Sequence, residues 1–291
     1  MTGYVSVIVP VYNDQTGINA CLVGLGSQTF PKDCYEVIVV DNNSNPPIRI
    51  DPVFSDFARL SIERRPGAYA ARNAGIKISR GNILAFIDAD CTPDPNWLEA
   101  GVRALNRGKG NYIIGGEVVF LPSKILTAVE RYQILTGFQQ RENIESLKFS
   151  ATANIYITRD QIMRIGFFDQ TLLSGGDREW AWRAKSAGLA IRYASDVIVH
   201  TIPRRSLSSA IRQARRVAGG RYALQHMRLA HIRSNGLKPH RSGLLAAKWI
   251  LTYPELSSWN RFKIFSVALT LKTMGIFETA RLSFGGSPER G

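Results

Sequence analysis

The sequence predicts an α/β fold built around a mostly parallel sheet, with helices covering both of its faces. In the first hundred residues, short strands that are almost wholly apolar alternate with helical segments. Strands of this kind are typical of parallel sheets, because both faces of such sheets are buried. Polar groups follow three of the strands, as "YND", "DNNS" and "DAD". Ligands of these sheets bind beyond the carboxyl ends of the strands, so the three groups indicate a site.

Four strands and two helices are predicted in this part of the chain. The strands are short, apolar and rich in β-branched residues. They cover residues 4–10, 35–44, 58–65 and 81–88. The first helix carries Ile18, Leu22 and Leu25 at helical spacing, and the second covers 67–79.

The rest of the chain is predicted to be more helical. The predicted elements are a strand at 111–120, a long amphipathic helix from about Lys124 to Arg141, a strand running into a turn at 150–160, a helix at 178–187 ending at Gly188, and one or two short strands at 190–203. From Ser206 the pattern is mainly helical, with breaks predicted at Gly219-Gly220, Asn235-Gly236 and Pro254. A sheet domain is therefore expected at 1–203 and a basic helical extension at 204–291.

Composition and cysteine usage narrow the class of protein. The 291 residues are 45% hydrophobic and 21% charged, which is an ordinary globular composition. The N-terminus shows no secretory signal, and no uninterrupted apolar run approaches the ~20 residues that cross a bilayer. Cys21, Cys34 and Cys91 lack CxxC spacing, which argues against a disulfide framework or zinc site and fits a reducing cytoplasm.

The charge of the chain is concentrated in its last third. Of a net +14, residues 201–291 contribute almost all, with 16 Lys and Arg against 3 Asp and Glu. This excess predicts an anionic partner. The stretches 244–253 and 259–277 mix aromatic and aliphatic residues with Lys and Arg, as helices at a lipid headgroup surface do. The alternative is that these helices pack on the sheet domain and expose a basic face to solvent.

Asp88 and Asp90 stand one residue apart at the end of the strand at 81–88. Two carboxylates in this position make a hard-oxygen site suited to Mg²⁺ or Mn²⁺, whose other ligands would come from a substrate diphosphate. The alternative is an Asx-type turn, because "DADCTPDPN" is rich in turn-forming residues.

Six motifs, in order along the chain, resemble those of family 2 glycosyltransferases. They are "VSVIVPVYND" (5–14), "QTF" (28–30), "EVIVVDNNS" (36–44), "GAYAARNAGI" (67–76), "ILAFIDADCTPDPNWLE" (83–99) and "GGDREWAWRAKSAG" (175–188). The resemblance covers about residues 4–203. It implies a GT-A fold, which is Rossmann-like, with a donor half at about 1–110 and an acceptor half at about 111–203. It also implies an inverting transferase that uses nucleotide sugars (hexosyltransferase class, EC 2.4).

The resemblance further implies roles for single residues. Nucleotide-sugar contacts are implied for Pro10, Tyr12, Asn13, Asp41, Asn43, Arg72, Asn73, Asp88 and Asp90. Metal ligands for Mn²⁺ or Mg²⁺ are implied for Asp90, Asp88 and His200, and the catalytic base is Asp177. From the residues alone, other readings stand beside these: Tyr12, Asp41 and Asn43 as turn residues, Arg72 as a solvated helix charge, and His200 as a satisfied strand-end histidine.

The chain departs from the family pattern at two positions. Gly176 stands where an acidic residue commonly precedes the base, although Glu179 and Arg183 keep the remaining spacing. The alternative role of Asp177 is a helix cap, and Glu179 is the reserve candidate for the base. "QARRV" at 213–217 is similar to the QxxRW signature of processive polysaccharide synthases, but Val217 replaces the tryptophan. A single-addition transferase is therefore expected.

The implied reaction moves a sugar from a nucleotide diphosphate sugar, UDP-linked by resemblance, to a glycan or lipid-linked acceptor, as in polysaccharide biosynthesis. We expect a cytoplasmic protein, peripheral on the inner face of the cell membrane, and no nucleic-acid partner. One alternative is an inactive domain that binds nucleotide sugars or glycans. Another is a metal-dependent nucleotidyltransferase, which would need a Gly- and Lys-rich triphosphate loop where the chain has "PVYNDQTG".

Overall fold

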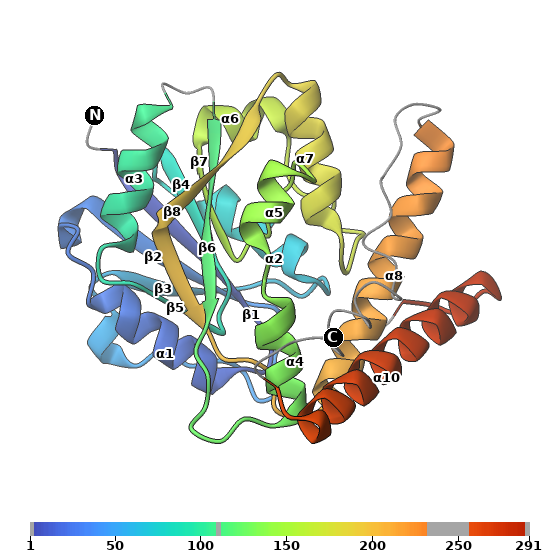
Figure 1. The fold of residues 1–291 in the computed structure, drawn as a ribbon. Helices are drawn as coiled ribbons and strands as arrows, with labels where there is room; N and C mark the ends of the chain where they lie inside the picture. The colour runs from blue at the N-terminus through green and yellow to red at the C-terminus, as the bar shows by residue number, and fades with distance from the viewer. Residues whose placement is uncertain (1–2, 109–111, 232–255, 289–291) are drawn as a thin grey trace. The chain divides into compact units, whose positions relative to one another are not determined.

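The computed structural model describes residues 3–108, 112–231 and 256–288, which fall into two compact units (Figure 1). The first unit consists of 1–121, 138–172 and 176–202. The second consists of 122–137, 173–175 and 203–291, so it joins the C-terminal part to two short segments from the middle of the chain. The predicted donor and acceptor halves stay a prediction.

One eight-stranded sheet forms the centre of the first unit, in the order β3-β2-β1-β4-β7-β6-β8-β5. The strands are β1 (Val5–Val11), β2 (Tyr35–Asp41), β3 (Ala58–Ile62), β4 (Ile83–Ile87), β5 (Cys91–Pro93), β6 (Tyr112–Phe120), β7 (Asn154–Thr158) and β8 (Ala190–Thr201). β3, β2, β1 and β4 run parallel, as do β6 and β8. β7 is antiparallel to its neighbours, and β5 is antiparallel to β8. The sheet is therefore mixed but mostly parallel.

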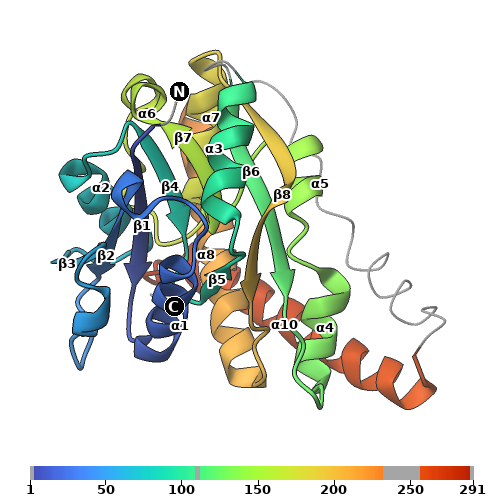
Figure 2. The ribbon, with the colours of Figure 1, turned by 90° about the vertical axis from the view of Figure 1, so that its left-hand side faces the viewer.

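Helices cover both faces of this sheet. The helices of the described residues are α1 (Gln15–Gly26), α2 (Ala68–Ile78), α3 (Trp97–Arg107), α4 (Ala128–Thr136), α5 (Gln140–Glu145), α6 (Arg159–Ile165), α7 (Gly176–Ser186), α8 (Leu207–His231) and α10 (Ser258–Ser283), with 3₁₀ turns η1 (Lys32–Cys34) and η2 (Pro52–Phe54). α1 and α3 lie on one face (Figure 2), where Leu22 and Trp97 join Val7 in the core. α2 lies on the other face, where Ala71 packs on Ile38. Because both faces are covered, β1 and β2 are buried at every position.

The predicted long helix from Lys124 to Arg141 is wrong, because α4 and α5 take its place. α4 begins with a capping box between Thr127 and Glu130 and ends at Gly137, whose φ is 63°. Gln139, at φ 54°, precedes α5. An α-helix cannot continue through residues in the left-handed region, so the segment is divided there.

Two further predictions are corrected by local geometry. The segment at 150–160 is a strand followed by α6, because Thr158 and Gln161 form a capping box that starts a helix. The predicted break at Gly219-Gly220 is absent from α8. A Cβ at Gly220 would lie 2.6 Å from the Ser174 carbonyl oxygen, so this glycine permits close backbone approach instead of ending the helix. The predicted breaks at Asn235-Gly236 and Pro254, and the stretch 244–253, lie outside the described residues.

The second unit has its own small core. Val129 of α4, Ala210 of α8 and Val267 of α10 pack together. Glu278 of α10 is 1% exposed and its carboxylate accepts hydrogen bonds from Arg215 and Arg281. Within the described ranges, no helix combines the length and apolarity that crossing a bilayer requires.

Candidate active site

The predicted polar groups come together at one edge of the sheet. β1 pairs in parallel with both β2 and β4, and Val11, Asp41 and Ile87 are the last residues of these three strands. Parallel neighbours end on the same side, so "YND", "DNNS" and "DAD" follow the same edge. The three polar groups that predicted the site therefore follow strands that are neighbours in the sheet.

Asn13 and Asp41 shape the loop that follows β2. The Asn13 backbone N–H donates to Ser44 Oγ at 2.8 Å, and Asn13 Oδ1 accepts from the Asn45 N–H at 2.8 Å. Asp41 is buried and accepts from the N–H groups of Ser44 and Ile48, at 2.9 and 3.1 Å. Both side chains therefore hold backbone, as turn residues do. Their contacts with a nucleotide stay predictions.

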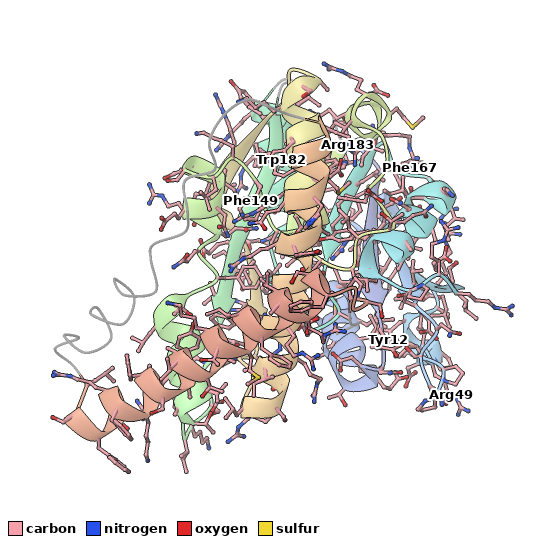
Figure 3. All side chains as sticks on the ribbon, turned by 90° about the vertical axis from the view of Figure 1, so that its right-hand side faces the viewer. Tyr12, Arg49, Phe149, Phe167, Trp182 and Arg183 are labelled. Atoms are coloured by element: carbon pink, nitrogen blue, oxygen red, sulfur yellow. The ribbon has the colours of Figure 1, made fainter. Side chains whose placement is uncertain are left out.

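Three more of the predicted nucleotide-sugar contacts differ in exposure. Pro10 is buried within β1, in register with Val40. Asn43 is exposed, with φ 62°. Tyr12 is 40% exposed after the end of β1 (Figure 3). Of the three, Tyr12 offers an aromatic face on which a base can stack.

Arg72 and Asn73 are neighbours on α2 with different partners. Arg72 is 3% exposed, and its guanidinium donates to Asp88 Oδ1. Its Nε is buried without a hydrogen-bond partner. The Asn73 amide bonds to both backbone groups of Phe168, at 2.8 and 3.0 Å. Arg72 thus lies beside the aspartate pair, whereas Asn73 holds the Phe168 loop, and the geometry does not favour its predicted nucleotide contact.

The predicted metal ligands are only partly brought together. Asp88 and Asp90 follow β4, where Asp88 is partly exposed and Asp90 exposed. His200, on β8, has Nε2 at 2.6 Å from Asp94 Oδ1, and its Nδ1 is buried without a hydrogen-bond partner. Among the residues with described placement, no cluster of three or more His, Cys, Asp or Glu side chains is arranged to hold a metal ion. The two aspartates still fit Mg²⁺ or Mn²⁺, which proteins commonly hold with one or two carboxylates plus substrate phosphates.

Asp177, the predicted base, lies at the start of α7 and bonds to side chains. Its Oδ1 accepts from the Tyr69 hydroxyl at 3.0 Å and from Thr152 Oγ1 at 3.1 Å. Its backbone N–H donates to the Tyr69 oxygen at 3.2 Å. No helix N–H donates to its carboxylate within the described residues, so its bonding is not that of a helix cap.

The surroundings of Asp177 alter its protonation. Burial raises the pKa of the Asp177 carboxyl, although the charge of Arg72 and the hydrogen bond from Tyr69 act in the opposite direction. Burial and the Asp177 charge raise the pKa of Tyr69 well above its ordinary value, so Tyr69 remains a hydrogen-bond donor at neutral pH. A carboxyl with a raised pKa is a stronger base than an ordinary aspartate.

The reserve candidate, Glu179, is tied to an arginine. Arg183 donates to both oxygens of Glu179, at 2.6 and 2.8 Å, and also to the Ile165 carbonyl. This bidentate pair engages both oxygens of the carboxylate. The geometry therefore favours Asp177 over Glu179 as the base.

Sequence reasoning missed the side chains that hold the site together. Tyr69 lies inside the motif at 67–76, but its partner Asp177 is 108 residues away along the chain. Thr152 also bonds Asp177 across distant sequence. Asn42 accepts from the Gly67 N–H and donates to the carbonyls of Glu63 and Arg65. The position of Asn42 within "DNNS" could have indicated its role in the site, whereas no sequence feature pointed to Thr152.

Comparison with known proteins relates this chain to a family. Residues 6–166 match the family described as "Glycosyl transferase family 2". Glycosyltransferase AglE of Haloferax volcanii is 41% identical over 200 residues, which are 67% of this chain and 66% of that protein. The pre-mycofactocin glycosyltransferase of Mycobacterium tuberculosis is 28% identical over 205 residues, or 65% of this chain and 40% of that protein. The match thus spans less than two thirds of the length of either relative.

Solved structures share the fold. The mannosyltransferase PcManGT from Pyrobaculum calidifontis, in complex with GDP-Man and Mn²⁺, has a TM-score of 0.55 at 20% identity and covers 98% of this chain and 77% of that chain. S. aureus TarS 1-349 in complex with UDP has a TM-score of 0.52 at 17% identity, covering 98% and 93%. The predicted GT-A fold is confirmed. With more than half of its residues inside the family match, the chain belongs to glycosyl transferase family 2.

Proposed function

We propose that the chain is an inverting glycosyltransferase that moves a sugar from a nucleotide diphosphate sugar to an acceptor hydroxyl. One observation carries the proposal: Asp177 and the Arg72–Asp88 pair both adjoin Tyr69. The Tyr69 hydroxyl lies 3.0 Å from Asp177, and its ring centroid lies 5.5 Å from Arg72 Cζ. Such a transfer requires a cationic group for the phosphates and a carboxylate that takes the acceptor proton.

In this proposal the acceptor oxygen attacks the anomeric carbon as the bond from that carbon to the diphosphate oxygen breaks. The acceptor proton moves to Asp177, and the nucleoside diphosphate leaves. Attack opposite the leaving group inverts the configuration. Arg72 stabilises the negative charge that develops on the departing diphosphate.

Asp90 and Asp88 would hold the divalent cation. When bound, Mn²⁺ or Mg²⁺ neutralises charge on the two phosphates. The donor set supports this assignment, since both carboxylates follow one strand and Asp90 is exposed. His200 is a weaker candidate, because its Nε2 lies 2.6 Å from Asp94 Oδ1.

The direct test is hydrolysis or transfer from a panel of UDP-, GDP- and dTDP-sugars with Mn²⁺. We expect release of one nucleoside diphosphate by the wild type, with loss in Asp90→Ala and Asp177→Asn. Nucleotide binding without turnover of any sugar, by a wild type that is otherwise folded, would support the inactive binding domain instead. UDP-sugars are tested first. UDP- and GDP-sugars are compared directly, because TarS was solved with UDP and PcManGT with GDP-Man.

A lipid-linked acceptor at an anionic membrane surface is the second part of the proposal. A similar protein of H. volcanii, 27% identical over 150 residues, is named glucosyl-dolichyl phosphate glucuronosyltransferase. α10 is apolar on two faces: Val267 packs in the core of the second unit, while large side chains between 55% and 63% exposed lie on another face. These exposed residues are Trp259, Phe262, Leu269, Ile276 and Phe277.

The spacing of these residues supports a membrane-facing stripe. Phe262, Leu269 and Ile276 recur every seven residues, which keeps them on one side of a helix. Exposed Lys263 and Lys272 lie along the same helix. An apolar face with flanking lysines suits the headgroup region of a bilayer, where each lysine adds ~1 kcal/mol on anionic lipid. The protein would then act in the cytoplasm, peripheral on the inner face of the membrane.

Vesicle co-sedimentation tests this part. We expect binding to vesicles containing phosphatidylglycerol at low salt, weaker binding at high salt, and loss in Phe262→Asp/Leu269→Asp. Val23→Asp/Met163→Asp, which adds two charges at exposed apolar residues of α1 and α6, is the matched control. Absence of binding at low salt would remove the membrane proposal and leave the transfer proposal untouched.

A further inference from the structure

We propose that Tyr69 is a positioning residue for the Asp177 base, and that Gly176 is glycine because the Tyr69 ring fills the space beside it. The proposal rests on the proposed role of Asp177 and goes beyond it. It gives a steric reason for glycine at the position before Asp177.

The first step concerns which carboxylate oxygen is used. Two hydroxyl groups, from Tyr69 and Thr152, both donate to Oδ1 of Asp177, at 3.0 and 3.1 Å. The Tyr69 oxygen also accepts from the Asp177 backbone N–H at 3.2 Å. Within the described residues, Oδ2 receives no hydrogen bond. The pattern fixes the plane of the carboxylate and leaves Oδ2 for the acceptor proton.

The second step concerns space at position 176. A Cβ built on Gly176 would lie 2.6 to 2.9 Å from three atoms of the Tyr69 ring. Contacts this short exclude any side chain unless the ring moves, and the ring is held. It stacks on Phe168 with centroids 5.8 Å apart, and Tyr69 is 6% exposed. Gly176 has no positive φ, so the need for glycine here is steric. The bulky ring of Tyr69 therefore occupies the space that a side chain at position 176 would need.

The third step concerns what the tyrosine connects. Arg72 Cζ lies 5.5 Å from the Tyr69 ring centroid, and Arg72 bonds Asp88. Phe168, which stacks on Tyr69, is held in turn by Asn73. α2 therefore supports the base from the same turn that carries Arg72. An acidic residue at 176 would instead place a second negative charge beside Asp177 and raise the pKa of the base.

Carboxyl ¹³C NMR titration of aspartate-labelled full-length protein tests the proposal without a substrate. Asp177→Asn assigns the signal. Tyr69→Phe keeps the ring and removes only the hydroxyl, so we expect the Asp177 pKa to rise, because the lost hydrogen bond favoured the ionised form. Tyr156→Phe is the matched control, since Tyr156 is also buried and donates to a backbone carbonyl, that of Trp97, at 3.0 Å. An Asp177 pKa unchanged in Tyr69→Phe would overturn the proposal.

Kinetics on UDP-glucose or GDP-mannose gives the second readout. Tyr69→Phe should lower kcat about tenfold to hundredfold, the effect of one hydrogen bond to a charged group, and move the acid limb of the profile to higher pH. Gly176→Ala should lower stability, and it should lower it less in a Tyr69→Ala background, where the ring is absent. An equal loss in both backgrounds would overturn the steric argument. If Asp177→Asn keeps full activity, the base assignment fails; if it is inactive while Tyr69→Phe matches wild type, only the positioning role fails.

Discussion

At the residue scale, hydrogen-bond partners distinguish the buried carboxylates from the partly exposed Asp177, the candidate base. Both oxygens of Asp41 accept from backbone N–H groups. Both oxygens of Glu130 and of Glu278 are bonded as well. Asp177 differs, because its two donors share one oxygen. This difference is consistent with the proposed role of Asp177, because its second oxygen remains to accept a proton.

The first prediction concerns the pH dependence of transfer. A general base must be unprotonated, so activity falls as pH drops through its pKa. Because burial raises the pKa of Asp177, the acid limb of kcat/KM should lie above the ordinary range of aspartate. Asp177→Asn should lower kcat by about 10²- to 10⁴-fold, and its residual activity should lose that limb. A full acid limb in Asp177→Asn would assign the titration to another group.

The second prediction concerns the buried Glu36 and stability. Burial acts to raise the pKa of Glu36, but the bonds from Ser6 and Arg80 and the charge of Arg59 outweigh it and lower the pKa. A lowered folded-state pKa contributes stability above the unfolded pKa, and this is lost as pH falls through the folded value. Glu36→Gln should therefore lower the free energy of unfolding by about 1–3 kcal/mol at pH 7, and less in acid.

Urea unfolding at pH 7 and at pH 3, well below the ordinary pKa of glutamate, measures this difference. Glu145→Gln is the matched control, because Glu145 forms an exposed i,i+4 pair with Arg141 and should change stability by less than about 1 kcal/mol. An equal loss in Glu36→Gln at both pH values would show that packing, and not charge, is responsible.

At the element scale, apolar runs predicted the strands better than spacing predicted helix ends. The strands at 4–10, 35–44 and 81–88 became β1, β2 and β4 with small shifts, because a strand buried on both faces must be apolar throughout. Glycines were harder to interpret, since Gly137 divides a helix and Gly220 does not. The difference lies in φ and in close neighbours, which local sequence does not encode.

The third prediction uses the two adjacent glycines of α8. A Cβ at Gly219 would make only ordinary contacts, the nearest at 3.7 Å, whereas at Gly220 it would lie 2.6 Å from a carbonyl oxygen. Gly219→Ala should stabilise by up to about 1 kcal/mol, since alanine favours the helix. Gly220→Ala should destabilise by about 1–3 kcal/mol. Thermal unfolding of both variants measures this; stabilisation by both would contradict the close approach.

At the scale of the whole molecule, the sequence predicted which strand ends come together better than it predicted the contacts of each residue. The three polar groups that follow apolar strands lie after the same edge of the sheet, because parallel neighbours end together. The pairing of Tyr69 with Gly176 and Asp177 was beyond reach, because it depends on bringing α2 and α7 together across 108 residues. Asp41 and Asn73 were predicted from family position, and their bonds to backbone appear only in the structure.

The last prediction uses ligand binding to separate the proposed roles of the aspartate pair and of Asp177. A ligand that binds only the folded protein adds about 2.7 kcal/mol of stability at one hundred times its Kd, so a cognate nucleoside diphosphate raises Tm. If Asp90 and Asp88 hold the cation, the rise with UDP or GDP should grow when Mn²⁺ is added. Asp90→Asn should lose that increment and keep the part due to nucleotide alone. Asp177→Asn should keep both parts, because in the proposed reaction its carboxylate takes the acceptor proton and does not contact the phosphates. Thermal shift with each nucleotide, with and without Mn²⁺, separates these cases, and an equal metal increment in Asp90→Asn would move the cation away from the strand end.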